Sequence, residues 1–102
     1  MTAEEFTSVI AERVLGWKVT PDRFIKSGRS WIPRWRFTPL TRLDHAFELL
    51  DRAASEYRMM TIAGVFSAEV QVGNRTGKAT GEPKAKTITL AIAKALGIEA
   101  PQ

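Results

Sequence analysis

The sequence predicts one α+β domain spanning residues 1–102, a layered α/β sandwich in which a mainly antiparallel sheet of about four strands packs against three helices. Three observations support this fold class. The chain of 102 residues, 44% of them hydrophobic, can build one core but not two. Three segments repeat apolar residues at helical spacing between start and stop signals. Short alternating segments with glycine-containing turns separate the second of these from the third, as in antiparallel hairpins.

The first helix is predicted to start after Thr2, because Thr2 and Glu5 have the spacing of a capping box. Gly16 supplies a stop signal near its end. Its buried stripe consists of apolar residues at helical spacing: Phe6, Val9, Ile10, Val14 and Trp17. The periodicity is lost from residue 18 to residue 30, and this segment is predicted to be a basic loop.

Residues 31–37 alternate aromatic with basic side chains, which predicts a half-buried strand. Trp31, Trp35 and Phe37 share one parity and are expected to face the core, and Pro33 favours an edge position. An exposed face on which nucleic-acid bases stack is the less favoured interpretation of the same pattern.

A second helix is predicted to begin near Thr41, which resembles a cap paired with Asp44, and to run to about Ser55. His45 is expected on its solvated face. The buried stripe of this helix consists of Leu43, Ala46, Phe47, Leu50, Ala54 and Tyr57.

Strands are predicted over residues 57–62 and 66–72, joined by a tight turn at Ala63-Gly64. Residues 73–77 are expected to connect the second strand to a brief third one at 78–80.

Pro83 is placed in the first turn of the last helix. Gly97 is expected to close that helix, with Ile98 folding back on it and residues 99–102 forming a loose tail. The side chains expected in the core are Phe6, Ile10, Val14, Phe47, Leu50, Phe66, Val70, Ile88, Ile92 and Leu96.

Charge is concentrated in one segment of the chain. Residues 18–42 hold seven basic residues against one acid, a net charge of +6, whereas the whole chain carries +4. The same segment holds Trp31 and Trp35. A mildly acidic scaffold with one strongly basic segment favours a polyanionic partner.

Two groups of residues are candidates for binding nucleic acid or another anion. Arg29, Arg34 and Arg36 lie in the basic segment, and replacing Arg34 and Arg36 by glutamine is expected to flatten the salt dependence of binding by about 1 to 2 units. The second group lies at the start of the last helix, where free N–H groups attract phosphate, and in the hairpin before it. It comprises Arg75, Lys78, Lys84 and Lys86. Trp31 and Trp35 are also candidates for interface aromatics.

The residue types argue against several classes of function. The chain has no cysteine and a single histidine, His45, so thiolate or multi-histidine metal sites are excluded and no metal or cofactor is expected. No serine lies in a nucleophile motif and no glycine-rich phosphate loop occurs, so we expect no catalytic residue and no enzymatic activity. No apolar run reaches the ~18 residues of a membrane span. The acidic N-terminus is unlike a signal peptide, and a cytoplasmic location without membrane contact is expected.

Two stretches carry a resemblance to a known family. Residues 37–50, FTPLTRLDHAFELL, resemble the F-x-P-S-T-D-x-x-A-A-x-x-V-V segment of phage ABA sandwich domain proteins, with Leu40-Thr41-Arg42 departing from it. Residues 85–97 are similar to the family's C-terminal helix with its A-L-K-A-L-G-like end, and Leu15-Gly16-Trp17 is similar to its V-M-G-W opening. The resemblance implies a small phage- or prophage-encoded α/β sandwich of unknown biochemical role, and it carries over no active-site residue.

Residues 43–97 also follow the α-β-β-β-α order of a double-stranded-RNA-binding domain, in which lysines that open the last helix grip phosphates. Lys84 and Lys86 are similar to those lysines, but Ala85 separates them and the loop between the first two strands is reduced to Ala63-Gly64. This is a likeness of topology, which is weak evidence for function.

The leading functional hypothesis is therefore a non-enzymatic phage or prophage accessory protein that binds an unidentified protein partner. The alternative is a nucleic-acid-binding module that uses residues 18–42 and the start of the last helix. The exposure of Trp31 and Trp35 distinguishes the two, because bases can stack only on rings that reach solvent.

Overall fold

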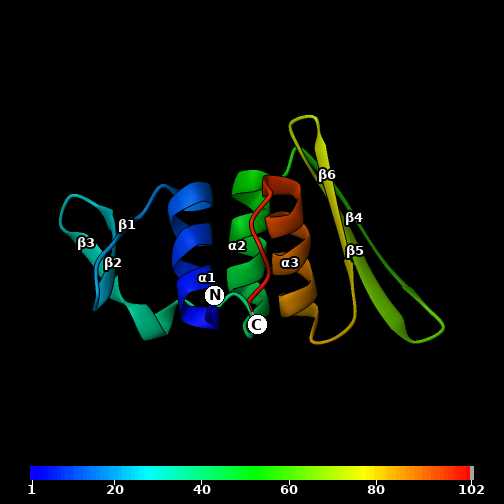
Figure 1. Ribbon diagram of the computed structural model, residues 1–102, viewed down its shortest axis with the longest axis horizontal. Coiled ribbons are helices and arrows are strands. Elements are labelled where there is room, and N and C mark those ends of the chain that lie inside the picture. Colours follow the sequence, from blue (N-terminus) through cyan, green and yellow to red (C-terminus); the bar gives the residue numbers. More distant parts are fainter. Residues whose placement is uncertain (102) are drawn as a thin grey trace.

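Residues 1–101 are described by a computed structural model, in which three helices lie side by side between two sheets (Figure 1). Both sheets are antiparallel and three-stranded, in the orders β1-β2-β3 and β4-β5-β6. The elements are α1 (Ala3–Ile10), η1 (Ala11–Leu15), β1 (Lys18–Val19), β2 (Arg23–Ser27), β3 (Ser30–Pro33), η2 (Arg34–Arg36), α2 (Leu43–Ala53), β4 (Glu56–Ile62), β5 (Val65–Val72), β6 (Arg75–Thr80) and α3 (Lys84–Leu96). The α+β class is confirmed, but the expectation of one sheet with about four strands is wrong.

The N-terminal helix follows its sequence signals. The Thr2 hydroxyl accepts a hydrogen bond from the Glu5 backbone N–H at 3.1 Å, which completes the predicted cap. The last turn, η1, widens to a π-helix and ends at Gly16, whose φ of 72° is readily adopted by glycine. Phe6 and Ile10 are fully buried, as predicted.

The predicted basic loop of residues 18–30 is instead a small sheet. Thr20 holds the turn between β1 and β2, because its hydroxyl accepts from the Arg23 N–H at 3.2 Å. Gly28, with a φ of 52°, turns the chain from β2 into β3. The predicted strand over residues 31–37 ends at Pro33, after which the 3₁₀ helix η2 destroys the two-residue alternation. Phe37 is buried, but Trp35 in η2 is exposed, and so is Trp31 on β3, which faces away from the core. The expectation that both tryptophans face the core is wrong.

The second helix begins two residues after its predicted cap. The Thr41 hydroxyl donates to the Thr38 carbonyl and caps nothing, and the N-cap position is Arg42. Leu43 and Tyr57 are exposed and do not belong to the buried stripe.

The expectation of a solvated His45 is also wrong. Its Nδ1 accepts the Thr38 N–H at 3.0 Å, and its ring stacks on Phe37 with centroids 5.2 Å apart. His45 therefore holds the bend that leads into α2.

The C-terminal half matches its prediction closely. β4 and β5 are joined at Ala63-Gly64, and the next turn needs only Gly73-Asn74, so β6 starts earlier than expected. Gly97, with a φ of 75°, ends α3, and the Ile98 N–H donates to the Ala93 carbonyl at 2.8 Å in the predicted Schellman arrangement.

The core lies where the helices pack on one another and where α3 packs on β5 and β6. Most of the expected core side chains are buried, and three of them, Val14, Phe47 and Leu96, are only partly buried. Large buried side chains that the sequence did not single out for the core include Phe24 and Leu49.

Candidate functional site

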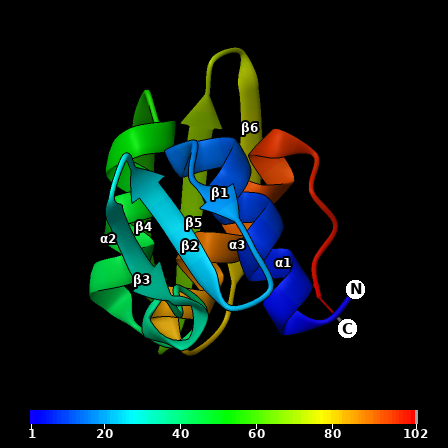
Figure 2. The ribbon, with the colours of Figure 1, turned by 90° about the vertical axis from the view of Figure 1, so that its left-hand side faces the viewer.

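The outer face of the β1-β2-β3 sheet carries basic and aromatic side chains. Lys18, Ile25 and Trp31 stand opposite one another across the three strands, so they share one face. The neighbouring row of Val19, Phe24 and Ile32 faces the core, where Phe24 is buried. Figure 2 shows this sheet toward the viewer, in front of α1 and α2.

Arg23 stacks on Trp31 on that outer face. The Arg23 guanidinium carbon lies 4.0 Å from the centre of the Trp31 ring, at a cation–π distance. The same guanidinium donates to the Asp22 carboxylate, with Nη2 and Oδ2 3.0 Å apart. Hydrogen bonds from Arg23 and then from Thr20 lower the pKa of Asp22. The pair thus holds the half-exposed indole of Trp31 in place.

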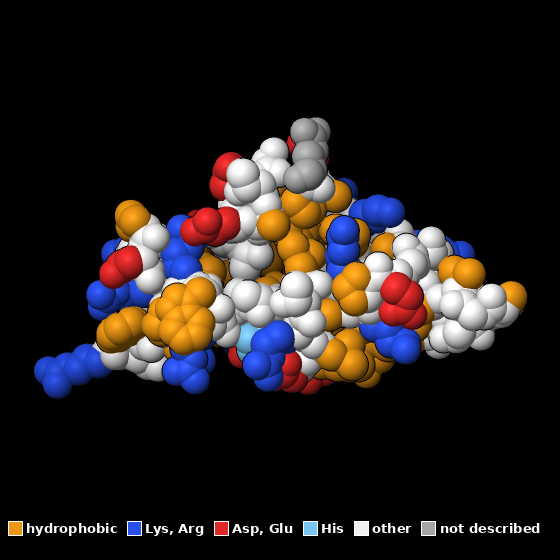
Figure 3. Space-filling model, turned by 90° about the horizontal axis from the view of Figure 1, so that it is seen from below, with side chains coloured by type: hydrophobic (Ala, Val, Ile, Leu, Met, Phe, Trp, Pro, Cys, Tyr) orange, Lys and Arg blue, Asp and Glu red, His pale blue; other side chains and the backbone are white. Residues whose placement is uncertain are grey.

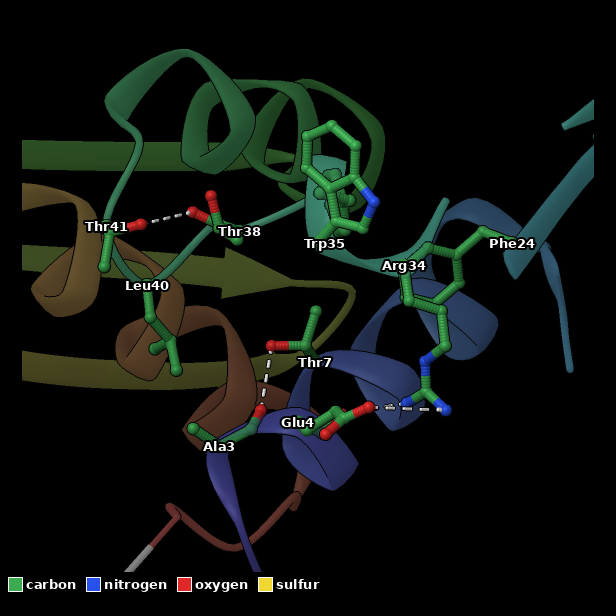
Figure 4. Close-up of a pocket in the computed structure, with 10 residues that line it drawn as sticks. Ala3, Glu4, Thr7, Phe24, Arg34, Trp35, Thr38, Leu40 and Thr41 are labelled. Atoms are coloured by element: carbon green, nitrogen blue, oxygen red, sulfur yellow. Dashed lines mark hydrogen bonds and ion pairs between the residues drawn. The ribbon is translucent and has the colours of Figure 1, made fainter. Parts of the chain in front are cut away.

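Trp35 stands in η2 and is 75% exposed, the largest fraction among the large hydrophobic side chains of the described residues. It lies on the rim of a groove of about 370 Å³ between α1 and the segment from η2 to Thr41 (Figure 4). The other lining residues are Ala3, Glu4, Thr7, Phe24, Arg34, Phe37, Thr38, Leu40 and Thr41. An indole on the rim of a largely apolar groove offers a stacking surface beside a cavity for a flat or aliphatic group.

Arg34 points inward although its neighbour Arg36 is exposed. Its Nη2 donates to the Ser8 hydroxyl and to the Glu4 carbonyl at 3.4 Å, and its Nη1 donates to the Thr20 carbonyl at 3.5 Å. Its side chain is only 19% exposed. The predicted ligand-binding role for Arg34 therefore competes with a structural one, in which Arg34 fastens η2 and the β1–β2 turn to α1.

Exposed cations surround the two tryptophans. Lys18 is on the outer face, Arg29 is at the β2–β3 turn, and Arg36 follows Trp35 in η2. Among residues 1–101, these three side chains have neither an ion pair nor a hydrogen bond. Figure 3 shows basic and hydrophobic side chains interleaved at this end of the molecule. We refer to Lys18, Arg23, Arg29, Trp31, Trp35 and Arg36 as the basic-aromatic platform.

The second predicted group of cations is only partly gathered at the start of α3: Lys84 and Lys86 lie there, whereas Arg75 and Lys78 lie on β6. The Arg75 guanidinium lies beside Gly97, at the C-terminal end of α3. Lys84 and Lys86 lie at the opposite end of this helix of 13 residues, about 20 Å away. The Lys84 ammonium sits 5.7 Å from the centre of the Phe66 ring.

Potential metal ligands are dispersed among the described residues. No cluster of three or more potential metal ligands occurs among residues 1–101. The one histidine is hydrogen-bonded within the bend before α2. In the part of the chain that the structure describes, no helix has the length and apolar character needed to cross a membrane.

Sequence reasoning missed the shared face of Lys18, Arg23 and Trp31, because it treated residues 18–30 as a loop. The signal was present in Gly28, a turn-forming residue between two short segments rich in β-forming residues. The groove beside Trp35 had no sequence signal, since α1 and the segment from η2 to Thr41 that form it lie far apart in the chain.

Two comparisons with known proteins give matches, one with family models and one with solved structures. The family model described as the Phage ABA sandwich domain matches residues 8–95. Among solved structures, the chain resembles the 2.0 Å crystal structure of a phage protein from Bacillus cereus ATCC 14579, with a TM-score of 0.75 and 16% sequence identity. That alignment covers 98% of this chain and 92% of the other. No curated protein matches the chain.

Proposed function

The chain belongs to the phage ABA sandwich domain family, and within that family we propose that it is a non-enzymatic module that binds single-stranded nucleic acid through the basic-aromatic platform. The observation that carries the proposal is the exposure of Trp31 and Trp35, at 49% and 75%, beside cations without intramolecular partners. The sequence favoured buried rings, and their exposure reverses the order of the two functional hypotheses.

Stacking supports the proposal because each ring can accept a base. Base–aromatic stacking contributes about 1–3 kcal/mol per base and tolerates any sequence. Among residues 1–101, no aromatic ring or cation stacks on Trp35. Its exposed indole beside the groove is therefore free to stack on a base. Trp31 already has Arg23 against one face, which leaves the opposite face for a base.

Charge supports the proposal because the platform is almost purely cationic. Two acids lie near it: Asp22 is bound to Arg23, and the Glu4 carboxylate in the groove lies 3.8 Å from Nη1 of Arg34. The unpaired positive charge is therefore carried by Lys18, Arg29 and Arg36. Three or four phosphate contacts predict a log–log salt slope of about −2 to −3 for single strands.

A protein partner is the second candidate, and the groove beside Trp35 favours it. An apolar side chain of a partner could fill a cavity of about 370 Å³, with Trp35 and Arg36 supplying the residue types enriched at interfaces. The surrounding positive charge would select a partner with an acidic surface.

A fluorescence titration with a 15-residue thymidine oligomer at low salt tests the first candidate. We expect quenching of tryptophan emission and a salt slope of about −2 to −3. Trp35→Ala should weaken binding roughly 5- to 150-fold, the equivalent of one lost stacking contact. Arg58→Gln removes an exposed cation from β4, outside the platform, and serves as the matched control with unchanged affinity apart from a small nonspecific effect. An absence of quenching at about 100 μM oligomer would reject nucleic-acid binding and leave the protein partner.

A further inference from the structure

β4 is the open edge strand of the second sheet. Its seven residues pair with β5 on one side only, and α3 packs mainly on β5 and β6. Figure 1 shows the β4–β5 hairpin extending away from the helices. A long edge strand exposes a row of backbone donors and acceptors that can pair with another strand.

The turn at Ala63-Gly64 fixes which backbone groups of β4 are free. A two-residue turn makes Ile62 and Val65 a hydrogen-bonded pair, so every second residue back from Ile62 bonds to β5. The residues in between, Tyr57, Met59 and Thr61, direct their N–H and C=O groups outward. Among residues 1–101, the backbone groups of these three have no hydrogen-bond partner.

The other edge of the same sheet is protected, whereas β4 is not. On β6, the Lys94 ammonium donates to the Lys78 carbonyl at 3.0 Å, and Lys78 itself places charge along the edge. Lysines of this kind discourage pairing with another chain. β4 contains no proline, lysine or bulge, and its pairing with β5 is regular over the whole strand.

Hydrophobic side chains are exposed around this edge. Ile62 is 67% exposed, and Tyr57, Met60 and Val65 are also exposed. Tyr57, Met60 and Ile62 belong to β4, and Val65 begins β5 after the turn. Figure 3 shows hydrophobic side chains at the right-hand end of the molecule, where the β4–β5 turn lies. Covering such side chains stabilises an association in addition to the backbone hydrogen bonds.

We propose that β4 pairs antiparallel with β4 of a second copy of this chain, about a two-fold axis through Met59, and joins the two sheets into one of six strands. In this register Met59 faces Met59 of the second copy, and Tyr57 faces Thr61 in both directions. All three outward-facing residues of each strand are then used, and all seven residues of β4 are paired.

Other registers pair fewer of the free backbone groups of β4 or place like charges opposite each other. An axis through Arg58 opposes two arginines, and it requires backbone groups that already bond to β5. An axis through Tyr57 would place Thr61 against Ala53, which belongs to α2 and cannot pair as a strand. With the axis at Met59, Arg58 faces Met60 and Glu56 faces Ile62, so no charge directly opposes a like charge. The positions of the free backbone groups and of the charged side chains thus favour pairing of two copies with the axis at Met59.

Two double variants test the pairing, because residues 57 and 61 face each other only between copies. Tyr57→Lys/Thr61→Lys brings lysines together twice across the axis, and we expect a monomer in sedimentation velocity at about 100 μM. Tyr57→Glu/Thr61→Lys places a carboxylate opposite an amine twice, and we expect the dimer of the unmodified chain to return. All of these side chains are exposed in the single chain, so folding is preserved.

The absence of cysteine from the chain permits a second measurement. Met59→Cys should form a disulfide-linked dimer on mild oxidation, because opposed residues lie within disulfide reach. Thr76→Cys on β6 is the matched control: it should still dimerise through β4 but form no disulfide-linked dimer. The proposal is overturned by a monomeric unmodified chain, by a dimer that survives Tyr57→Lys/Thr61→Lys, or by cross-linking through β6. These outcomes do not depend on whether the platform binds nucleic acid.

Discussion

Replacing Arg34 or Arg36 by glutamine should change two different properties of the protein, its stability and its affinity for single strands. The sequence alone predicts that Arg34 and Arg36 contribute alike to phosphate binding. In the structure, Arg36 is exposed and unpaired among residues 1–101, whereas Arg34 donates to Ser8, Glu4 and Thr20. Arg34→Gln should therefore lower stability, and Arg36→Gln should lower affinity for single strands.

The magnitude for Arg34→Gln follows from its contacts. Glutamine is too short to reach α1, so the bonds to Ser8 and Glu4 are lost together with the one to Thr20. Hydrogen bonds to charged groups contribute about 1.5–3 kcal/mol each, and the bonds of 3.4 and 3.5 Å belong to the weak end of that range. We expect a loss of about 2–4 kcal/mol in the free energy of unfolding. For a domain of this size that corresponds to roughly 10–25 °C in Tm.

Urea unfolding and an oligomer titration across salt concentrations separate the two effects. Arg36→Gln should change stability by no more than about 0.5 kcal/mol and flatten the salt slope by about 0.7 units. Arg34→Gln, measured where it remains folded, should leave the slope unchanged. The reasoning would be refuted by a stable Arg34→Gln variant with a flattened slope, since Arg34 would then be bound to phosphate and not to α1.

Three further predictions concern the fold and its pH dependence. Phe66→Ala should cost about 3–5 kcal/mol in urea unfolding, because the ring is buried beneath α3, and a loss below about 1 kcal/mol would contradict its placement. Gly77→Ala should destabilise by at least about 1–3 kcal/mol, because a Cβ there would overlap the Ala91 carbonyl and the Ala95 nitrogen, whereas Thr76→Ala beside it should be nearly neutral. Because the pKa of Asp22 is lowered in the folded state, its contribution is present above the unfolded value of about 3.9 and is lost as pH falls through the folded value. Trp31 emission should therefore change below about pH 4, and Asp22→Asn should abolish that change.

The C-terminal half could be predicted because its signals are local. Alternation over residues 66–72, the Ala63-Gly64 turn and the Gly97 stop each act within a few residues, and the structure confirms all three. Even so, the sequence did not reveal that Gly77 is required for the contact between β6 and α3. That requirement arises from the close packing of β6 on α3, and a glycine in the sequence does not show whether it serves a turn or such a close approach.

The N-terminal half was mispredicted where a single residue changes the geometry. Alternation through residues 31–37 is valid only while the chain stays extended, and the 3₁₀ turn after Pro33 rotates Trp35 out of the predicted face. Trp35 thus moves from core to surface although its parity matches that of buried Phe37. The sequence therefore located the candidate site in the correct segment. The exposure of its tryptophans and the inward direction of Arg34 could be recognised only from the tertiary structure.

The two proposed surfaces lie at opposite ends of a molecule whose longest extent is 44 Å (Figure 1). Pairing through β4 would leave both basic-aromatic platforms free, one at each distant end of the dimer. A short oligomer could then occupy only one platform, so its affinity should be independent of dimerisation. A strand long enough to span both would bind the second platform intramolecularly, and its affinity would rise through effective concentration without any new contact. The difference between short and long oligomers should consequently disappear in Tyr57→Lys/Thr61→Lys, because that change lies far from the platform and removes only the link between the two copies.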